Sequence, residues 1–237
     1  MQVDEAIQPV KRKRAASGKA KGLGLKQLFQ KKYKMLEGLP ESLKRSFGEM
    51  TEQILMIIYG PSSNGKSRLT MQFLKIIMRY GDVLYWALEE GHRRTMQKNA
   101  EENLTLDEHS GKITFWDHNL TFEELVVKLK KKKSAKFVVI DSLQYVHMNM
   151  DDYKYLKEHF PNKGFIFISH NKGSKPDGKL ACKIEFDVDI KVRVEGFVAF
   201  VKSRYGGNKP YVIWEGEDAT KGAWGYWGKK KVNQFKK

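Results

Sequence analysis

The sequence predicts an α/β fold with a mainly parallel central sheet and an antiparallel extension toward the C-terminus. Three observations lead to this class. Short apolar runs alternate with stretches of helical length between residues 54 and 169. A glycine-rich loop joins the first apolar run to the first helix. After residue 186 the apolar runs are joined instead by short bends that contain glycine, which favours antiparallel pairing.

The elements follow one another regularly along a predicted core of residues 51–216. Strands are predicted at 54–59, 82–88, 112–116, 136–141 and 164–168, with helices at 66–79, 92–103, 121–129 and 151–159. Thr121 and Glu124 stand at the two positions of a capping box at the start of the third helix. The antiparallel part is predicted at 186–194, 197–202 and 211–214.

Three segments flank this core. Residues 1–22 carry a run of four basic residues but no apolar face, which predicts a disordered basic arm. Contact with phosphates, nuclear import and solubility all stay open as its role. Residues 23–50 show mixed helical spacing and are predicted as a helical lead-in. Residues 217–237 form a tail of aromatics and lysines, suited to stacking on bases or adenine or to covering a neighbour's apolar edge.

The composition indicates a polyanionic partner. Lys and Arg number 44 against 28 Asp and Glu, so the formal net charge is +16, a balance typical of nucleic-acid-binding proteins. Cys182 is the only cysteine, which excludes an intrachain disulfide and indicates a reducing compartment. No secretory h-region opens the chain and no apolar run has the length of a membrane span. We therefore expect an intracellular, cytoplasmic protein, associated with a nucleoid or nucleus, and no membrane partner.

A phosphate-binding loop is the strongest motif. Gly60-Pro61-Ser62-Ser63-Asn64-Gly65-Lys66-Ser67 fits the pattern G-x-x-x-x-G-K-[ST] between a buried strand and an amphipathic helix that continues with Arg68. The glycines let the backbone approach a phosphate, and the backbone N–H groups and the positive helix end face that anion. Lys66 is expected to reach the outer phosphates and Ser67 to hold Mg²⁺. The residues from Gly60 to Arg68 are therefore predicted to bind ATP with Mg²⁺.

Two carboxylates meet the other requirements of triphosphate hydrolysis. Asp141 closes an apolar strand, and a buried aspartate needs a partner such as Mg²⁺. Glu89 ends the strand after the phosphate-loop helix and is expected to orient or deprotonate the attacking water. Strand alternation would point Glu90 elsewhere. Structural roles stay open for both residues, because Asp141 suits a helix N-cap and Glu89 suits the first turn of a helix.

The order of these motifs, together with the strand ending Ile166-Phe167-Ile168-Ser169-His170, resembles the RecA-like ATPases, nearest the branch of DnaB-type helicases and RadA recombination proteins. The resemblance covers residues 38–215 and implies a RecA-like three-layer fold. It implies that Glu89 is the catalytic base and that His170 senses the γ-phosphate and links it to a DNA-binding loop. A histidine that merely caps a strand end is the alternative.

Lys202 and Arg204 resemble a late basic motif of the same family, which projects into the nucleotide of the next subunit. On a strand the two residues share one face. The resemblance therefore implies a homo-oligomer, either a ring such as a hexamer or a filament. The alternative is a basic edge strand whose charges prevent aggregation.

Residues 171–179 stand where the family's second DNA-binding loop lies. Lys172, Lys175 and Lys179 are expected to follow the backbone of single-stranded DNA without sequence preference, because the loop has no aromatic side chain to stack on bases. The counterpart of the first loop, at 147–152, ends in acidic residues, and the separate N-terminal domain of DnaB-type helicases is not expected here. Helicase translocation therefore stays open.

The predicted function is that of an oligomeric, ATP-hydrolysing motor that acts on DNA in replication, recombination or a mobile-element process, with a protein recruiter as a further expected partner. The alternative is an ATP-dependent scaffold or switch that acts through protein partners. A small-molecule kinase is disfavoured because the sequence shows no acceptor site and no arginine-rich lid.

Overall fold

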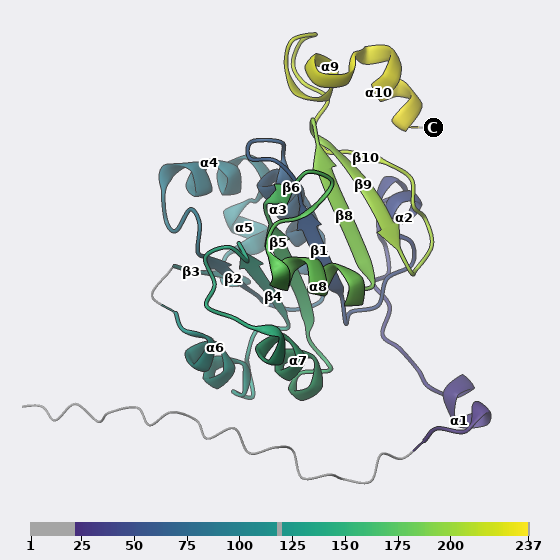
Figure 1. Cartoon of the computed structure of the whole chain (residues 1–237), viewed down its shortest axis with the longest axis vertical. Coiled ribbons are helices and arrows are strands. Elements are labelled where there is room, and N and C mark those ends of the chain that lie inside the picture. The colour runs from purple at the N-terminus through teal and green to yellow at the C-terminus, as the bar shows by residue number, and fades with distance from the viewer. Residues whose placement is uncertain (1–21, 118–119, 237) are drawn as a thin grey trace, which may run out of the picture. The chain divides into compact units, whose positions relative to one another are not determined.

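The computed structural model describes residues 22–117 and 120–236, and the chain divides into two units, residues 1–33 and 34–237. In the first unit, helix α1 (Leu25–Phe29) follows a short extended segment (Figure 1). The arm predicted for residues 1–22 lies, apart from Gly22, outside the described residues. All other elements belong to the second unit.

An eight-stranded sheet organises the second unit, in the order β10-β9-β8-β1-β5-β4-β2-β3 (Figure 1). The strands are β1 (Leu55–Tyr59), β2 (Val83–Ala87), β3 (Ile113–Trp116), β4 (Phe137–Asp141), β5 (Gly164–Ser169), β8 (Ile190–Glu195), β9 (Val198–Ser203) and β10 (Tyr211–Val212). Six neighbouring strands, from β8 to β3, are parallel, whereas β9 and β10 each pair antiparallel with the strand before them. This topology confirms the predicted parallel sheet with an antiparallel extension.

Helices cover both faces of the sheet. The first face is covered by α2 (Glu41–Phe47), α3 (Lys66–Ile77) and α4 (Arg94–Asn103), and the second by α6 (Phe122–Leu129), α7 (Met150–His159) and α8 (Lys179–Asp187). Side chains of β1 alternate between the two cores, with Met56 and Ile58 in the first and Ile57 and Tyr59 in the second. The short helix α5 (Leu106–His109) leads into β3. The result is the three-layer RecA-like architecture.

The capping box at the start of α6 is present. The Glu124 backbone N–H donates to Thr121 Oγ1 at 3.2 Å, and the Thr121 N–H donates to Glu124 Oε2 at 2.8 Å. Two backbone donors that the helix cannot satisfy are thereby paired, as the sequence pattern predicts. None of the helices in the described residues is both long and apolar enough to cross a bilayer.

The segment after β5 differs from the prediction. A two-stranded hairpin, β6 (Asn171–Lys172) and β7 (Lys175–Pro176), is followed by helix α8, where a loop and the start of a strand were predicted. Ala181, Ile184 and Val188 recur at helical spacing and are buried against the sheet, so tertiary packing favours a helix here. Lys179 is therefore the first residue of a helix, and the next strand begins at Ile190 instead of Phe186.

The aromatic tail folds onto its own chain. Helices α9 (Gly222–Trp227) and α10 (Lys229–Phe235) pack on the antiparallel extension, where the rings of Trp227 and Phe235 lie 5.9 Å and 5.7 Å from that of Phe200. Trp227 thus covers an apolar surface of its own sheet, a role that the sequence did not predict.

Candidate functional site

The predicted site residues gather at one edge of the sheet. The loop at 60–67 follows β1, Glu89 follows β2, Asp141 ends β4 and His170 follows β5. These four strands are parallel neighbours, with Tyr59 opposite Ser169 and Ala87 opposite Asp141, so their carboxyl ends meet. Such an edge is where open α/β sheets bind ligands.

The phosphate loop requires its two glycines for different reasons. A Cβ atom on Gly60 would lie 2.1 Å from the carbonyl oxygen of Val194, so any larger residue would collide with β8. Gly65 caps α3 with a φ of 103°, a conformation that side chains disfavour. Asn64 fastens the loop to the turn between β8 and β9, because its Oδ1 accepts from the Gly196 N–H at 2.7 Å. The loop therefore has a tertiary anchor that the motif does not indicate.

Lys66 lies at the centre of this loop. Its side chain is buried, and Nζ donates to the carbonyl oxygens of Gly60 and Pro61, both at 2.9 Å. Burial lowers the pKa of Lys66, while Glu89 and Asp141 oppose that change. A buried ammonium group that donates to two carbonyl oxygens can also bind a phosphate oxygen, and this charge-assisted contact would be strong. The nearby carboxylates require that such a ligand bring a cation with it.

Asp141 provides a buried carboxyl group next to this lysine. It is 4% exposed, and Tyr85 Oη donates to its Oδ2 at 2.5 Å. Burial raises its pKa to about 7, against the lowering effects of the Tyr85 hydrogen bond and of Lys66. A carboxylate in this position lacks a full counter-charge at neutral pH, which a divalent cation would supply.

The oxygen donors fit magnesium. Ser67 is half-buried in the first turn of α3, and it and Asp141 offer the hard oxygen ligands that Mg²⁺ prefers. No group of three or more His, Cys, Asp or Glu that could hold a metal occurs among the residues that the structure describes. The ion would therefore depend on phosphate and water oxygens for its remaining ligands, as is usual for Mg²⁺ in nucleotide sites.

Glu89 and His170 form a pair across the strand ends. Glu89 Oε2 lies 3.1 Å from His170 Nε2, and both side chains are partly exposed. Gln144 holds the backbone of the histidine, because its Oε1 accepts from the His170 N–H at 3.1 Å. Its Nε2 donates to Ser169 Oγ and to the carbonyl of Asp177, each at 2.9 Å. Gln144 was assigned no role from the sequence, where its position three residues after Asp141 was the available signal.

Glu90 does not follow the predicted strand alternation. Strand β2 ends at Ala87, and the next residues form a turn in which the Glu89 N–H donates to the carbonyl of Asp141 at 3.1 Å. Glu90 is half-buried and contributes to the shifted pKa values of Lys66 and Asp141, after Glu89 in both cases. It therefore belongs to the electrostatic surroundings of the site.

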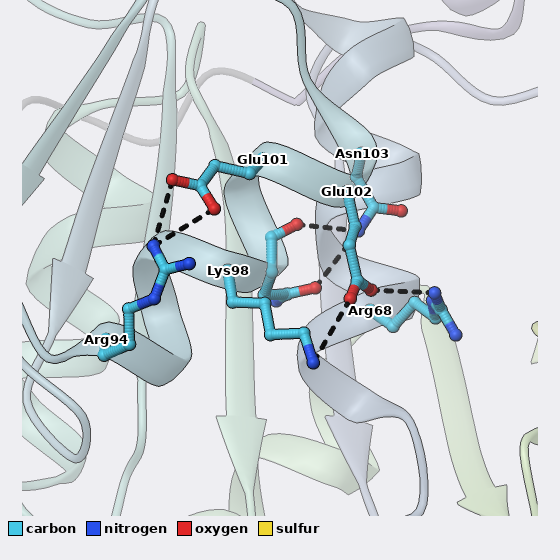
Figure 2. A network of polar contacts seen from close by, with 7 residues as sticks. Arg68, Arg94, Lys98, Glu101, Glu102 and Asn103 are labelled. Atoms are coloured by element: carbon cyan, nitrogen blue, oxygen red, sulfur yellow. Dashed lines mark hydrogen bonds and ion pairs between the residues drawn. The ribbon is translucent and has the colours of Figure 1, made fainter.

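The Arg68 side chain contacts helix α4 and the Trp214 ring. Its Nη2 lies 2.8 Å from Glu102 Oε2 of α4, and its guanidinium stacks over the Trp214 ring at 4.8 Å. Figure 2 shows Glu102 between Arg68 and Lys98. The Arg68 guanidinium is thus paired within the chain, but such a surface pair costs little to break, so nucleotide binding by Arg68 stays a prediction.

Lys202 and Arg204 lie at the other end of the sheet. Strand β9 is antiparallel to β8, so Val198 pairs with Glu195 near the phosphate loop and Ser203 pairs with Ile190 at the far end. Five residue steps of about 3.4 Å separate these pairs by roughly 17 Å. Arg204 Nη1 is paired with Asp189 Oδ1 at 3.0 Å and is largely exposed. The two residues therefore do not join the phosphate loop of their own chain.

The hairpin that carries Lys172 and Lys175 begins directly after the site residue His170. Hairpin β6–β7 follows His170 directly and is closed by the Asp177 N–H, which donates to the carbonyl of His170 at 2.9 Å. Lys172 and Lys175 are exposed on the hairpin, and Lys179 is exposed on α8. The structure thus links Glu89, His170 and the hairpin in one continuous chain of contacts.

Comparison with known proteins identifies the fold. No protein-family model and no curated protein matches the chain. Among solved structures, the flagellar accessory protein FlaH from Methanocaldococcus jannaschii is similar, with a TM-score of 0.55 and 16% identity, over 73% of this chain and 88% of FlaH. At this identity the likeness concerns the fold alone, and it supports the RecA-like architecture. It does not single out the DnaB-type or RadA branch.

Proposed function

We propose that the chain is a RecA-like ATPase that hydrolyses ATP with Mg²⁺, assembles into a ring or filament and acts on single-stranded nucleic acid. The observation that carries this proposal is the Glu89–His170 pair, which stands at the same sheet edge as Lys66 and Asp141. Hydrolysis needs a phosphate-binding group, a carboxylate for the metal and a base for the attacking water, and this edge offers all three.

Each residue has a distinct role in this proposal. The backbone of the loop at 60–67 and Lys66 bind the phosphates, while Ser67 and Asp141 hold the metal, which supplies charge neutralisation at the phosphates. Glu89 accepts the proton of the attacking water. His170 Nε2, 3.1 Å from Glu89, holds that carboxylate in place and is the first contact of the path to the hairpin. A ligand that binds the hairpin and moves it would therefore change the position of Glu89 through His170.

Two substitutions test the assignment of the base. Lys66→Ala should abolish both ATP binding and turnover, because the buried cation for the phosphates is lost. Glu89→Gln should lower turnover by about a hundredfold or more and leave ATP binding intact, since general-base catalysis contributes about 10²–10⁴-fold. Steady-state phosphate release and equilibrium binding of a fluorescent ATP analogue measure the two effects. Loss of binding in both variants would refute the role given to Glu89.

The matched control is Glu101→Gln on the exposed surface of α4, where the carboxylate pairs with Arg94 (Figure 2). It removes the same charge at a distance from the sheet edge and should retain wild-type turnover. Glu90→Gln separates the two adjacent glutamates, and it should retain most of the turnover if Glu89 is the base.

The partner is tested by the ATPase rate with single-stranded DNA, double-stranded DNA and RNA, with particle mass measured alongside. Stimulation by single-stranded DNA in a ring-sized or filamentous particle supports the proposal. Nucleotide-dependent assembly without stimulation by any nucleic acid would replace it with the scaffold or switch. Neutralising Lys172 and Lys175 should weaken the binding of single-stranded nucleic acid. The slope of log affinity against log salt concentration should fall in magnitude by about 0.7 for each lost phosphate contact.

A further inference from the structure

The outer face of α8 is basic and carries one exposed aromatic ring. Ala181 and Ile184 face the sheet and are buried. At 100° per residue, Lys179, Lys183 and Phe186 fall on the opposite side of the helix, and all three are exposed. Phe186 is 70% exposed, although phenylalanine is usually buried.

Two strands continue this face. Ile190 and Val192 of β8 belong to the core on the α3 side, so Lys191 between them points to the α8 side. Its Nζ lies 5.8 Å from the centroid of the Phe186 ring. Lys202 of β9 is directly opposite Lys191 in the ladder. We call the set Lys179, Lys183, Phe186, Lys191 and Lys202 the α8 surface.

The charges of the α8 surface are not balanced within the chain. Like charges directly opposite each other in an antiparallel pair are destabilising, and Lys191 and Lys202 form such a pair. Two of the carboxylates nearby pair with other cations, Asp187 with Lys157 and Asp189 with Arg204. Glu185 accepts a hydrogen bond from Tyr59 and keeps its negative charge, which is fewer than the four positive charges of the lysines. In the described part of the chain, none of the four lysines forms an ion pair with a carboxylate. An external polyanion would relieve this repulsion.

We propose that the α8 surface binds single-stranded nucleic acid, with the lysines on successive phosphates and one base stacked on Phe186. This inference rests on the proposed action on nucleic acid and assigns its path, which runs from Lys172 and Lys175 on the hairpin along α8 to β9. A basic track with an aromatic platform is how proteins bind single strands without sequence preference. A duplex would not present an open base face to Phe186. The aromatic contact that residues 171–179 lack is thus provided by a helix that follows them.

The position of Lys202 opposite Lys191 suggests a role other than the one that the family resemblance implies. In this chain it lies beside Lys191, so the proposal gives it to the nucleic-acid path and leaves Arg204 as the residue for the next subunit.

The test is fluorescence anisotropy on the full chain with labelled oligo-dT of about 20 nucleotides and an abasic oligonucleotide of the same length. Phe186→Leu keeps an apolar side chain but removes the ring, and it should weaken oligo-dT binding about fivefold or more while leaving the abasic strand unaffected. Phe186→Tyr should bind both like wild type. Because Phe186 is 70% exposed, neither change should alter the circular dichroism or the basal ATPase rate.

The contacts of the lysines with phosphates are tested with the double variant Lys183→Gln/Lys191→Gln. The slope of log affinity against log salt concentration should fall in magnitude by about 1.4, because each lost phosphate contact contributes about 0.7. The matched control is Lys75→Gln/Lys98→Gln, which removes two exposed charges from α3 and α4 on the other face of the sheet and should leave the slope unchanged.

Three results would overturn the α8 surface. The first is equal affinity of wild type and Phe186→Leu for oligo-dT, and the second is equal affinity of wild type for oligo-dT and the abasic strand. The third is loss of self-association in the α8 variants with intact oligonucleotide binding, which would identify an interface between subunits. If Lys172→Gln/Lys175→Gln loses binding while the α8 variants do not, the proposed function stands and only this inference falls. If wild type binds no oligonucleotide, both fall.

Discussion

The carboxyl group of Asp141 is buried at the end of β4, where it accepts a hydrogen bond from Tyr85 and lies near Lys66 and Glu89. Its pKa is raised from an ordinary value of 3.8 to about 7, chiefly by burial. Between these two values the folded chain binds more protons than the unfolded chain, so the free energy of unfolding falls as the pH rises. Above about pH 7 the full cost of a buried carboxylate is present.

Asp141→Asn should therefore stabilise the protein in a pH-dependent way. The amide does not ionise, and its oxygen can still accept from Tyr85. Relative to wild type, the gain in free energy of unfolding should be larger at pH 8 than at pH 5 by on the order of 2 kcal/mol, at about 1.4 kcal/mol per pH unit. Urea titrations without nucleotide or magnesium measure it. Asp107→Asn, at an exposed position on α5, should give the same value at both pH values. A gain for Asp141→Asn that does not vary with pH would contradict the burial of an ionisable group.

Residue identity alone did not reveal which neighbours each site residue meets. Arg68 follows the phosphate-loop motif, yet its guanidinium pairs with Glu102 because α4 packs against α3. Asn64 is an unspecified position of that motif, yet it binds the turn between β8 and β9. In both cases the partner is more than 30 residues away in sequence, and only packing brings it close.

At the scale of elements, helix α6 follows local rules closely. The capping box of Thr121 and Glu124 is formed as the sequence predicts. The Thr121 interactions lower the pKa of Glu124, so this cap is weakened when the pH falls low enough to protonate that carboxylate.

Thr121→Ala should lower the free energy of unfolding by about 1 kcal/mol, because one backbone donor at the start of α6 loses its partner. Thr121→Ser keeps the hydroxyl and should remain within a few tenths of a kcal/mol of wild type. Chemical denaturation measures both, and the ATPase rate should be unchanged, since Asp141 and Lys66 do not depend on this cap. Equal stability of the alanine and serine variants would show that the cap does not stabilise the fold.

Helix α8 shows how packing overrides a local signal. At its C-terminal end Ile184, Phe186 and the following Val188 are apolar and alternate with polar residues, as in a strand that is half buried. The helix forms because Ala181, Ile184 and Val188 fill the space over β1 and β5. In a helix Phe186 turns outward, which creates the α8 surface.

Across the whole molecule, the parallel sheet separates two groups of predicted site residues. The carboxyl edge carries the phosphate loop, Glu89, Asp141 and His170, whereas Arg204 lies at the opposite edge. The Arg204 side chain is exposed and forms a surface pair with Asp189, which costs little to break. This separation is compatible with a role of Arg204 at the nucleotide of the next subunit.

The protein recruiter and the intracellular location stay predictions.

Arg204→Ala should therefore act across subunits. An assembly of Arg204→Ala chains alone should lose turnover, because every site then lacks the arginine of its neighbour. Mixing with Lys66→Ala chains, which contribute an intact Arg204, gives the matched comparison and should restore part of the lost turnover. No turnover in mixtures of Arg204→Ala and Lys66→Ala chains would contradict a shared site, because each variant supplies the residue that the other lacks.

Local sequence patterns are enough to predict the class of fold and the edge of the sheet at which the predicted site residues gather. Apolar periodicity places each strand, and the glycine pattern from Gly60 to Gly65 specifies a phosphate loop, since both depend on interactions within a few residues. Because the strands are parallel, Glu89, Asp141 and His170 then had to meet at one edge.

The contacts that these residues make follow from tertiary packing. The hydrogen bond of Gln144 to His170, the pairing of Arg68 with Glu102 and the approach of Lys191 to Phe186 join separate elements. Such contacts depend on how helices dock on the sheet, and docking is set by the summed burial of many side chains. No short stretch of sequence carries that information.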